Sequence, residues 1–399
     1  MTRSIGRQKG TPNEMNREGN SQELFSLPPE IEQFRASARA FAERDVAPTV
    51  DAAEESATFP VALFKKAGDL GLLGLQFDAE WGGSEAGLLP DMIFREEVSR
   101  VCAGIAAGLG IQGQIGTAYL AKHGSSEQKD RWLRPALAGE LITAWAVTEP
   151  DAGSDVRAIR SRVTRHGEHF ALNGRKTYIT NGPIAGAIGV VAKQENDRFA
   201  VFLVEAGDAG YACERTLEKL GCRSSQVGEL VFDNVVLDES RRLSPPDGST
   251  IDEILDVLIR GRVLIAAAAL GVAGAAFDLG LAYAKQRQAF GRSIGRFQEI
   301  SMKFAEADAR IAAARLLTYR AAHLCDVRDR VPVRECAQAK LIASETAVWV
   351  VDQMMRVFGG IGFMREAPIE RLYRDVRYFQ IVEGTTEIQH RILAKELGL

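Results

Sequence analysis

The hydrophobic period of the chain changes near residue 142 and again near residue 250, and these two changes constrain the fold more than any other feature. From 28 to about 141, apolar residues recur at three- and four-residue spacing, which is typical of amphipathic helices. Between about 142 and 243 the period becomes two, as expected for short β-strands. After a Pro- and Gly-containing linker the pattern is helical to the end. The sequence therefore predicts a mainly α fold with a central β domain.

These patterns divide the chain into four predicted segments. A polar stretch, 1–24, is predicted to be a disordered lead-in, and 25–141 form an N-terminal helical domain. The middle β domain covers 142–243, and a C-terminal helical bundle covers 250–399. Within the bundle we expect one long helix at 251–290 and further helices at 297–327, 333–358, 369–376 and 386–397.

Short strands separated by turn residues are predicted in the middle domain, at 144–148, 161–163, 170–172, 176–180, 188–192, 199–204 and 229–236. Asn173-Gly174 is a hairpin-turn signal, and a second turn is expected between His166 and His169. Without further histidines or cysteines at ligand spacing, the two histidines indicate a solvated turn, and no metal site is predicted.

Charge and cysteine usage narrow the functional classes. The formal net charge is -4 and the pI about 5.9, so no basic field attracts nucleic acid, and none is expected as a partner. The five cysteines are odd in number and never form a C-x-x-C pair, which indicates free thiols in a reducing compartment. We therefore expect a cytoplasmic protein.

The N-terminal 24 residues lack the apolar segment of a secretory signal. Four basic residues in this stretch leave a mitochondrial transit peptide, and hence the matrix, open as an alternative, whereas three glutamates oppose it. The longest apolar run, 263–276, is too short to span a bilayer, so no membrane span is predicted.

Residues 108–113, Gly-Leu-Gly-Ile-Gln-Gly, satisfy the G-x-G-x-x-G pattern of dinucleotide-binding folds. That fingerprint requires a strand before it and a crossover helix after it, whereas small residues at helical spacing precede it here. We therefore interpret the glycines as positions of tight helix packing.

Two loops of the middle domain concentrate hydroxyl groups and backbone N–H groups. One follows a predicted strand and covers 147–156, and the other covers 178–182. Such loops could bind a heteroaromatic ring that carries carbonyl groups and ring nitrogens, but each loop taken alone is better explained as an ordinary turn.

Glu383 stands out near the C-terminus as a single carboxylate between an apolar run and a helix start. Its apolar neighbours would desolvate the carboxylate and raise its pKa toward neutrality, as a general base requires. Gly384 permits close backbone approach, and Thr386-x-x-Gln389 has capping-box spacing for the last helix. An ordinary capped helix with an acidic first turn explains the same residues.

Five motifs taken together resemble the acyl-CoA dehydrogenase family over about residues 25–399. In order they are Thr-Glu-Pro-x-Ala-Gly-Ser-Asp from 148, Tyr-Ile-Thr-Asn-Gly from 178, Arg-Gln-Ala-Phe-Gly from 287, Phe-Gly-Gly-x-Gly from 358 and Glu-Gly-Thr-Thr from 383. The resemblance implies an N-terminal helical domain, a middle β-barrel-like domain and a C-terminal four-helix bundle, with FAD between the last two. It also implies a homo-oligomer, a dimer or a tetramer.

The resemblance implies that Glu383 removes the α-proton of an acyl thioester while the β-carbon delivers hydride to flavin N5, giving the trans-2-enoyl thioester. The enolate oxygen would be stabilised by the backbone N–H of Glu383 and by a flavin ribityl hydroxyl. Some relatives place the base on a bundle helix, at the position that Gly261 occupies here. Glu383 is therefore the only candidate base by motif.

The same resemblance assigns the remaining site residues. Those expected at the cofactor are Trp145, Val147, Thr148, Gly153, Ser154, Tyr178, Ile179, Thr180, Arg287, Phe290, Gln298, Arg356, Gly359, Gly360, Gly384, Thr385 and Glu387. Those expected at the substrate are Ser154, Ser225, Arg262 and Gly384. Among them, Arg287, Phe290 and Gln298 would reach the FAD of a neighbouring subunit.

Three departures from the family pattern leave the thioester carrier open. Val382 replaces a frequent aromatic residue, Ile259 replaces a frequent acidic residue, and 243–251 lack a Gly-rich run. The substrate is therefore expected to be an acyl-CoA or an acyl group on a carrier protein. The electron acceptor would be an electron-transferring flavoprotein, or dioxygen if the protein is an oxidase. A relative that acts on nitroalkanes and a binding protein without turnover are the remaining alternatives.

Overall fold

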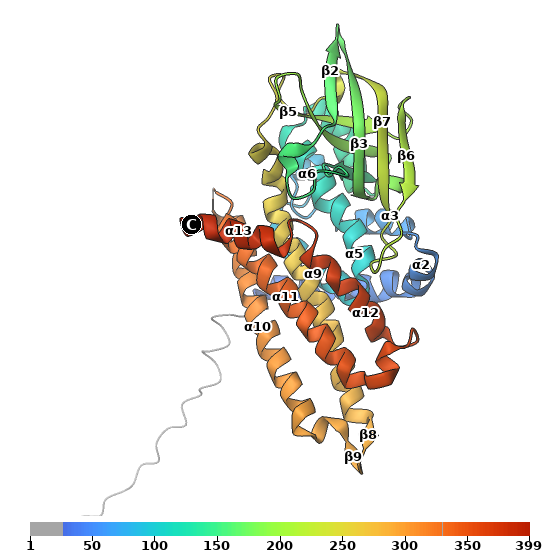
Figure 1. Ribbon diagram of the computed structural model, residues 1–399, viewed down its shortest axis with the longest axis vertical. Coiled ribbons are helices and arrows are strands. Elements are labelled where there is room, and N and C mark those ends of the chain that lie inside the picture. Colours follow the sequence, from blue (N-terminus) through green and yellow to red (C-terminus); the bar gives the residue numbers. More distant parts are fainter. Residues whose placement is uncertain (1–26, 329) are drawn as a thin grey trace, which may run out of the picture.

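The computed structural model describes residues 27–328 and 330–399, so the predicted lead-in at 1–24 lies outside the described residues. The β domain occupies one end of the molecule and the long C-terminal helices extend to the other, with the N-terminal helices packed against both (Figure 1). The predicted order of helices, β domain and helices is confirmed.

The N-terminal part is helical throughout, as the hydrophobic period predicts. Its α-helices are α1 (Pro29–Phe41), α2 (Val50–Ser56), α3 (Ala62–Asp69), α4 (Leu88–Val101), α5 (Ala103–Gly110), α6 (Gly116–His123), α7 (Ser126–Gln128) and α8 (Arg134–Leu137). A π-helical turn, Ile111–Ile115, joins α5 to α6, so the G-x-G-x-x-G run is helical and not a strand-to-helix turn. A Cβ atom on Gly108 would come within 2.3 Å of the Phe59 ring, so α5 packs closely against the segment between α2 and α3.

The middle domain is a seven-stranded sheet in the order β1-β4-β2-β3-β7-β6, with β5 paired to β4. Its strands are β1 (Thr143–Ala146), β2 (Arg162–His166), β3 (His169–Thr180), β4 (Ala187–Lys193), β5 (Phe199–Glu205), β6 (Tyr211–Thr216) and β7 (Val227–Asp238). The strand β6 was not predicted, because its residues are mostly exposed and carry only a weak alternation.

The prediction of a hairpin turn at Asn173-Gly174 is wrong. The chain continues through these residues as one strand, β3, which pairs with β7 along most of its length and shifts register between Leu172 and Gly174. The dipeptide therefore forms a bulge in a long strand, and Gly174 adopts a φ of 153° there. The β2–β3 hairpin turns instead between His166 and His169, as predicted, and both histidines are exposed.

The C-terminal part contains α9 (Ile251–Gln286), α10 (Gln298–Val327), α11 (Val333–Phe358), α12 (Pro368–Val376) and α13 (Thr386–Glu396). All five predicted helices are observed, but α9 ends at Gln286 and not at residue 290. A small hairpin, β8 (Gln288–Ala289) and β9 (Arg292–Ser293), follows it at the far end of the bundle (Figure 1).

Helix α9 is the central element of the bundle and packs against α4, α10 and α11. Its small residues allow close approach: a Cβ atom on Gly271 would lie 2.2 Å from the carbonyl oxygen of Glu96 in α4. Within the described ranges, α9 is the helix long and apolar enough to cross a membrane by length and composition. However, 72% of its most apolar window is buried inside the protein, as in a core helix.

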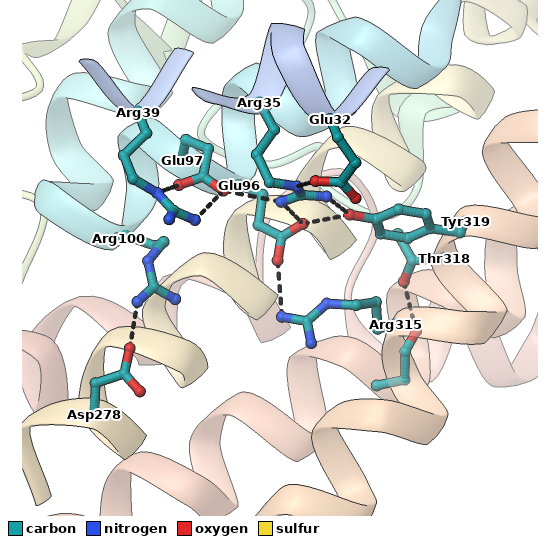
Figure 2. Close-up of polar contacts among 11 residues, drawn as sticks. Glu32, Arg35, Arg39, Glu96, Glu97, Arg100, Asp278, Arg315, Thr318 and Tyr319 are labelled. Atoms are coloured by element: carbon teal, nitrogen blue, oxygen red, sulfur yellow. Dashed lines mark hydrogen bonds and ion pairs between the residues drawn. The ribbon is translucent and has the colours of Figure 1, made fainter. Parts of the chain in front are cut away.

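A network of buried charges joins α1 to α4 and α10 (Figure 2). Glu97 of α4 accepts hydrogen bonds from Arg35 at 2.9 Å and from Arg39 at 3.0 Å. The neighbouring Glu96 accepts from Arg315 at 2.9 Å and from Tyr319 at 3.0 Å, both on α10. Because both carboxylates are buried, these contacts fix the N-terminal helix to the C-terminal bundle.

Candidate active site

The loop that carries Glu383 follows a 3-10 turn, Arg377–Gln380, and ends at the start of α13. Glu383 has a φ of 54° and Gly384 a φ of 85°, so two consecutive residues are left-handed. This conformation is costly for a residue with a side chain and is typical of functional loops. At Gly384 the positive φ favours glycine, and a Cβ atom there would lie 2.8 Å from Nε2 of Gln389, so it would displace that side chain.

Two buried side chains hold this loop by its carbonyl groups. Nζ of Lys340, on α11, donates to the carbonyl oxygen of Gly384 at 2.7 Å. Nε2 of Gln389 donates to the carbonyl oxygens of Glu383 at 3.3 Å and Gly384 at 2.8 Å. These contacts fix the backbone of the residue predicted to be the base.

The predicted capping box between Thr386 and Gln389 is wrong. The N-cap is Thr385, whose hydroxyl accepts from the backbone N–H of Ile388, and Gln389 contacts the preceding loop instead. The start shifts by one residue because the left-handed pair at Glu383 and Gly384 leads the chain into the helix at Thr385.

The Glu383 carboxylate is desolvated. Its Oε2 atom is buried and has no hydrogen-bond partner among the described residues. Burial raises the pKa of Glu383 to about 7, although the positive charges of Arg262 and Lys340 oppose this shift. Helix α9 passes directly over the carboxylate, since a Cβ atom on Gly261 would lie 3.0 Å from Oε2. The environment is that of a general base poised near neutral pH.

The carboxylate lines a narrow cavity of about 50 Å³ between α5, the following π-helical turn, α9 and the 3-10 turn before Glu383. Small and aliphatic side chains of α5, the π-helical turn and α9 form most of its wall, whereas of the predicted apolar neighbours Tyr378 and Phe379 reach the wall and Ile381 is exposed. The polar residues that also reach the wall are Arg95, Gln114 and Tyr378. The cavity can therefore take a short chain beside the base.

The two hydroxyl-bearing loops of the β domain lie side by side. The backbone N–H of Thr177 donates to the carbonyl oxygen of Thr148 at 2.9 Å. Beneath them, Nζ of Lys176 donates to the Val147 carbonyl oxygen and to Oε1 of Glu149, both at 2.8 Å. Burial lowers the pKa of Lys176 to about 8, and the Lys176 charge, which outweighs the effect of burial, holds the pKa of Glu149 below its usual range. This buried pair fixes both loops.

The predicted cofactor residues on these loops differ in exposure. A register shift in β3 turns Tyr178 outward, with a φ of 60° and 69% of its surface exposed. Thr148 and Thr180 are half-buried, whereas Gly153 and Ser154 are exposed.

Beside these loops, Trp145, Val147 and Ile179 are buried. Ser154 shares a cleft of about 480 Å³ with Ile388 and Arg391 of α13. The structure thus brings one β loop and the helix after Glu383 to a common cleft.

A second group of predicted cofactor residues lies at the opposite end of the bundle (Figure 1). Arg287 and Phe290 belong to the β8–β9 hairpin, and Gln298 begins α10. Phe290 is 96% exposed. Arg356, Gly359 and Gly360 lie at the end of α11, where Phe358 stacks on Tyr283 of α9. Within one chain, these residues do not join the group around Glu383.

The predicted substrate residues are also divided. Arg262 follows Gly261 on α9, its charge acts on Glu383, and its Nε atom is buried without a partner in the described part of the chain. Ser225 is buried, and its carbonyl oxygen accepts from Nζ of Lys219 at 2.5 Å.

Two further predicted cofactor residues, Thr385 and Glu387, lie at the start of α13.

Three residues that shape the site were not predicted from the sequence: Lys340, Gln389 as a loop anchor, and Arg95. Lys340 had a usable signal, because it is a lysine among alanine, cysteine and leucine positions of the buried face of α11. Arg95 had no such signal. Nearly every residue of α4 is buried, so the helix has no separate polar face, and the sequence does not mark Arg95 as a residue of the buried face.

Comparison with known proteins gives matches along nearly the whole chain. The N-terminal domain of acyl-CoA dehydrogenases matches residues 28–140, the middle domain 144–235 and the C-terminal domain 251–398. The short-chain specific acyl-CoA dehydrogenase of Clostridium acetobutylicum is 34% identical over 377 residues, covering 94% of this chain and 99% of that protein.

Solved structures agree with these matches. Butyryl-CoA dehydrogenase from Megasphaera elsdenii has a TM-score of 0.88 and 31% identity, covering 94% of this chain and 100% of that one. A glutaryl-CoA dehydrogenase from Mycobacterium smegmatis in complex with FADH2 has a TM-score of 0.90 and 28% identity, covering 95% and 96% of the two chains.

Proposed function

The chain belongs to the acyl-CoA dehydrogenase family, and from this premise we propose that Glu383 removes the α-proton of an acyl-CoA thioester. The observation that carries the proposal is the Glu383 carboxylate on the wall of a narrow, mostly apolar cavity, with its Oε2 atom buried and without a hydrogen-bond partner among the described residues. With a pKa of about 7 it accepts a proton readily at neutral pH. The reaction is the α,β-dehydrogenation of the acyl group to the trans-2-enoyl thioester.

FAD is the cofactor of this family, and the residues here fit it. Nε1 of Trp145 and Oγ1 of Thr386 are buried polar atoms that no described residue satisfies, one beside the β loops and one at the start of α13. Thr148 and Thr180 would hold the flavin ring, with Tyr178 against one face. Bound FAD supplies the acceptor for the hydride that leaves the β-carbon.

The Glu383 loop has a second task in the proposal. An α-proton next to a thioester is too weakly acidic for a carboxylate unless charge on the thioester oxygen is stabilised. We assign this to the backbone N–H of Glu383, a contribution of roughly 3–4 kcal/mol for a well-placed donor. The anchoring of the loop by Lys340 and Gln389 supports the assignment, because a fixed donor loses nothing to reorganisation.

The split of the cofactor residues between two ends of the bundle supports a homo-oligomer. If Phe290 and Gly359 line the same nucleotide as Thr385, they must come from another copy of the chain, in a dimer or a tetramer. For reoxidation we propose an electron-transferring flavoprotein. A similar chain occurs in a structure of that protein from Acidaminococcus fermentans, with 31% identity and a TM-score of 0.89, covering 94% and 99% of the chains. The proposed location is the cytoplasm, in keeping with five free cysteines.

The decisive experiment is Glu383→Gln. We expect the variant to bind FAD with an unchanged visible spectrum but to lose roughly 10²–10⁴-fold in the rate of anaerobic flavin bleaching by butyryl-CoA, because the amide cannot take the proton. Glu345→Gln, at an exposed position of α11, is the matched control and should bleach like the wild type. An unchanged rate in Glu383→Gln would place the base elsewhere.

A further inference from the structure

Arg95 of α4 is a buried cation that the proposed reaction does not use. Its side chain is 3% exposed, and the residue lines the same cavity as Glu383. Two glycines make room for its guanidinium: a Cβ atom on Gly110 would lie 3.1 Å from Nη1, and one on Gly113 would lie 2.7 Å from Nη2. The second and third glycines of the G-x-G-x-x-G run therefore let the guanidinium approach the segment that walls the cavity.

Only one edge of the guanidinium is paired. Nε donates to Oδ1 of Asp91 at 2.8 Å, and Oδ2 of Asp91 is taken by Nε2 of Gln76 at 2.7 Å. Nη1 and Nη2 are both buried and have no hydrogen-bond partner in residues 27–328 and 330–399. Buried polar groups in native proteins are almost always paired, and a guanidinium presents these two nitrogens as a fork that fits a carboxylate. Asp91 balances the charge of Arg95, and the unpaired fork still offers two donors to a ligand that carries two acceptor oxygens, such as a carboxylate.

The protein itself supplies no such partner within the cavity. The one carboxylate on the cavity wall, among the residues described, is Glu383, whose role is to face the α-carbon. Gln114 is neutral, so it is not an anionic partner, and its side-chain amide nitrogen donates to the carbonyl oxygen of Val257 at 2.8 Å. Alanine, glycine, leucine and isoleucine form most of the remaining wall. An apolar acyl chain would leave the two nitrogens unsatisfied.

We propose that Arg95 binds the terminal carboxylate of a short ω-carboxyacyl group, so that the preferred substrate is the CoA monothioester of a short dicarboxylic acid. The inference rests on the proposed function, since it concerns the acyl group that Glu383 deprotonates. The cavity volume of about 50 Å³ has room for about three to five groups the size of a water molecule, which suits a short chain. Glu383 and Arg95 together thus select an acyl group with a thioester carbonyl at one end and a carboxylate at the other.

The first test compares two substrates of the wild-type holoenzyme with an artificial dye as acceptor. These are glutaryl-CoA and 5-methylhexanoyl-CoA, in which an isopropyl group replaces the carboxylate. We expect kcat/KM to favour glutaryl-CoA by at least about 100-fold, because a site with buried donors rejects an analogue that cannot pair with them. Equal or reversed kcat/KM values would overturn the inference while leaving the dehydrogenase function intact. If neither these thioesters nor butyryl-CoA were oxidised, the proposed function itself would fail.

Variants of Arg95 then test whether this residue causes the preference for glutaryl-CoA. Arg95→Met should reduce the glutaryl to 5-methylhexanoyl ratio at least about 100-fold, and Arg95→Lys should reduce it less, because the charge remains but the fork is lost. Arg100→Met is the matched control on the same helix, since Arg100 pairs with Asp278 outside the cavity, and its ratio should equal that of the wild type. If Arg95→Met does not fold because Asp91 is left unpaired, Asp91→Asn combined with Arg95→Met takes its place. A retained preference in the variant that folds would contradict the assignment.

Discussion

At the scale of single residues, the catalytic proposal depends on how Glu383 is held as much as on its chemistry. A left-handed residue on a loop would ordinarily relax to another backbone conformation. Here Lys340 donates to the carbonyl oxygen of Gly384, and Gln389 donates to the carbonyl oxygens of Glu383 and Gly384. Lys340 has a second effect, because its charge lowers the pKa of Glu383 against the effect of burial. Burial in turn lowers the pKa of Lys340 to about 8. One lysine therefore helps to fix the loop of the base and, together with Arg262, lowers the pKa of the base.

This arrangement predicts the pH dependence of the reaction. Only the deprotonated carboxylate can accept the α-proton, so kcat/KM should rise with pH through a midpoint near 7. In Lys340→Met the midpoint should move upward, because a charge that lowers the pKa of Glu383 is removed. The profile is measured with butyryl-CoA and a dye acceptor, and Lys395→Met, at an exposed position of α13, serves as control. A midpoint that stays in place in Lys340→Met would contradict the proposed coupling.

The raised pKa of Glu383 has a consequence for stability as well. The unfolded chain binds this proton with a pKa near 4.5 and the folded protein with a pKa near 7. Between these values the folded state binds more protons, so this group lowers the free energy of unfolding as the pH rises through the window. Burying the Glu383 carboxylate thus lowers the stability of the folded protein at neutral pH.

At the scale of secondary-structure elements, the crossing of α9 and α4 determines how closely the bundle packs. Gly271→Ala would place a methyl carbon 2.2 Å from a backbone oxygen of α4, and backbone cannot move aside cheaply. We expect a loss of about 1–3 kcal/mol in the free energy of unfolding, measured by urea denaturation. Gly274→Ala on the same helix would meet only the flexible end of Arg100 and should be neutral or stabilising. Equal effects of the two substitutions would argue against backbone contact as the cause.

The C-terminal helices were predictable to within a few residues because long apolar patterns mark them, whereas short local signals failed. Asn173-Gly174 has the composition of a tight turn, yet pairing with β7 on both sides keeps the chain extended and leaves only a bulge. Thr386 and Gln389 have the spacing of a capping box, but the left-handed residues before them move the cap to Thr385. In the first case pairing with a distant strand overrides the local preference, and in the second the conformation of the two preceding residues does.

The candidate site was predictable where function requires a recognisable motif. Glu383 and the loops with Thr148 and Thr180 carry such motifs, and the structure gives them the buried carboxylate and the paired loops that they imply. Lys340 and Arg95 act from neighbouring helices, α11 and α4, and only the packing of those helices brings them to the cavity and its loop. No spacing in the sequence encodes that contact.

At the scale of the whole molecule, the network in Figure 2 joins segments from opposite ends of the chain. Burial raises the pKa of Glu97, but its hydrogen bonds with Arg39 and Arg35 outweigh this effect and hold the pKa below the usual range. A carboxyl group of this kind stabilises the fold above its unfolded pKa of about 4.5, and the contribution is lost as the pH falls through the lower folded-state value.

Glu97→Gln tests the network. We expect a loss of about 1–3 kcal/mol at neutral pH, less than for a fully buried pair because Arg39 is half exposed. The difference from the wild type should shrink as the pH is lowered below about 4.5, where the wild-type carboxylate also loses its charge. Thermal unfolding between pH 3.5 and 8 gives both quantities, with Glu43→Gln, exposed just after α1, as control. A difference that does not change with pH would mean that the ion pairs do not carry the effect.

Helix α11 limits where residues can be inserted into or deleted from this protein. Lys340 near its start holds the Glu383 loop, and Phe358 at its end precedes the glycines proposed for a neighbouring cofactor. These two residues are separated by 18 helical steps, about 27 Å along the axis. One inserted or deleted residue between them would rotate one end against the other by about 100°. This helix can therefore tolerate substitution but not insertion or deletion.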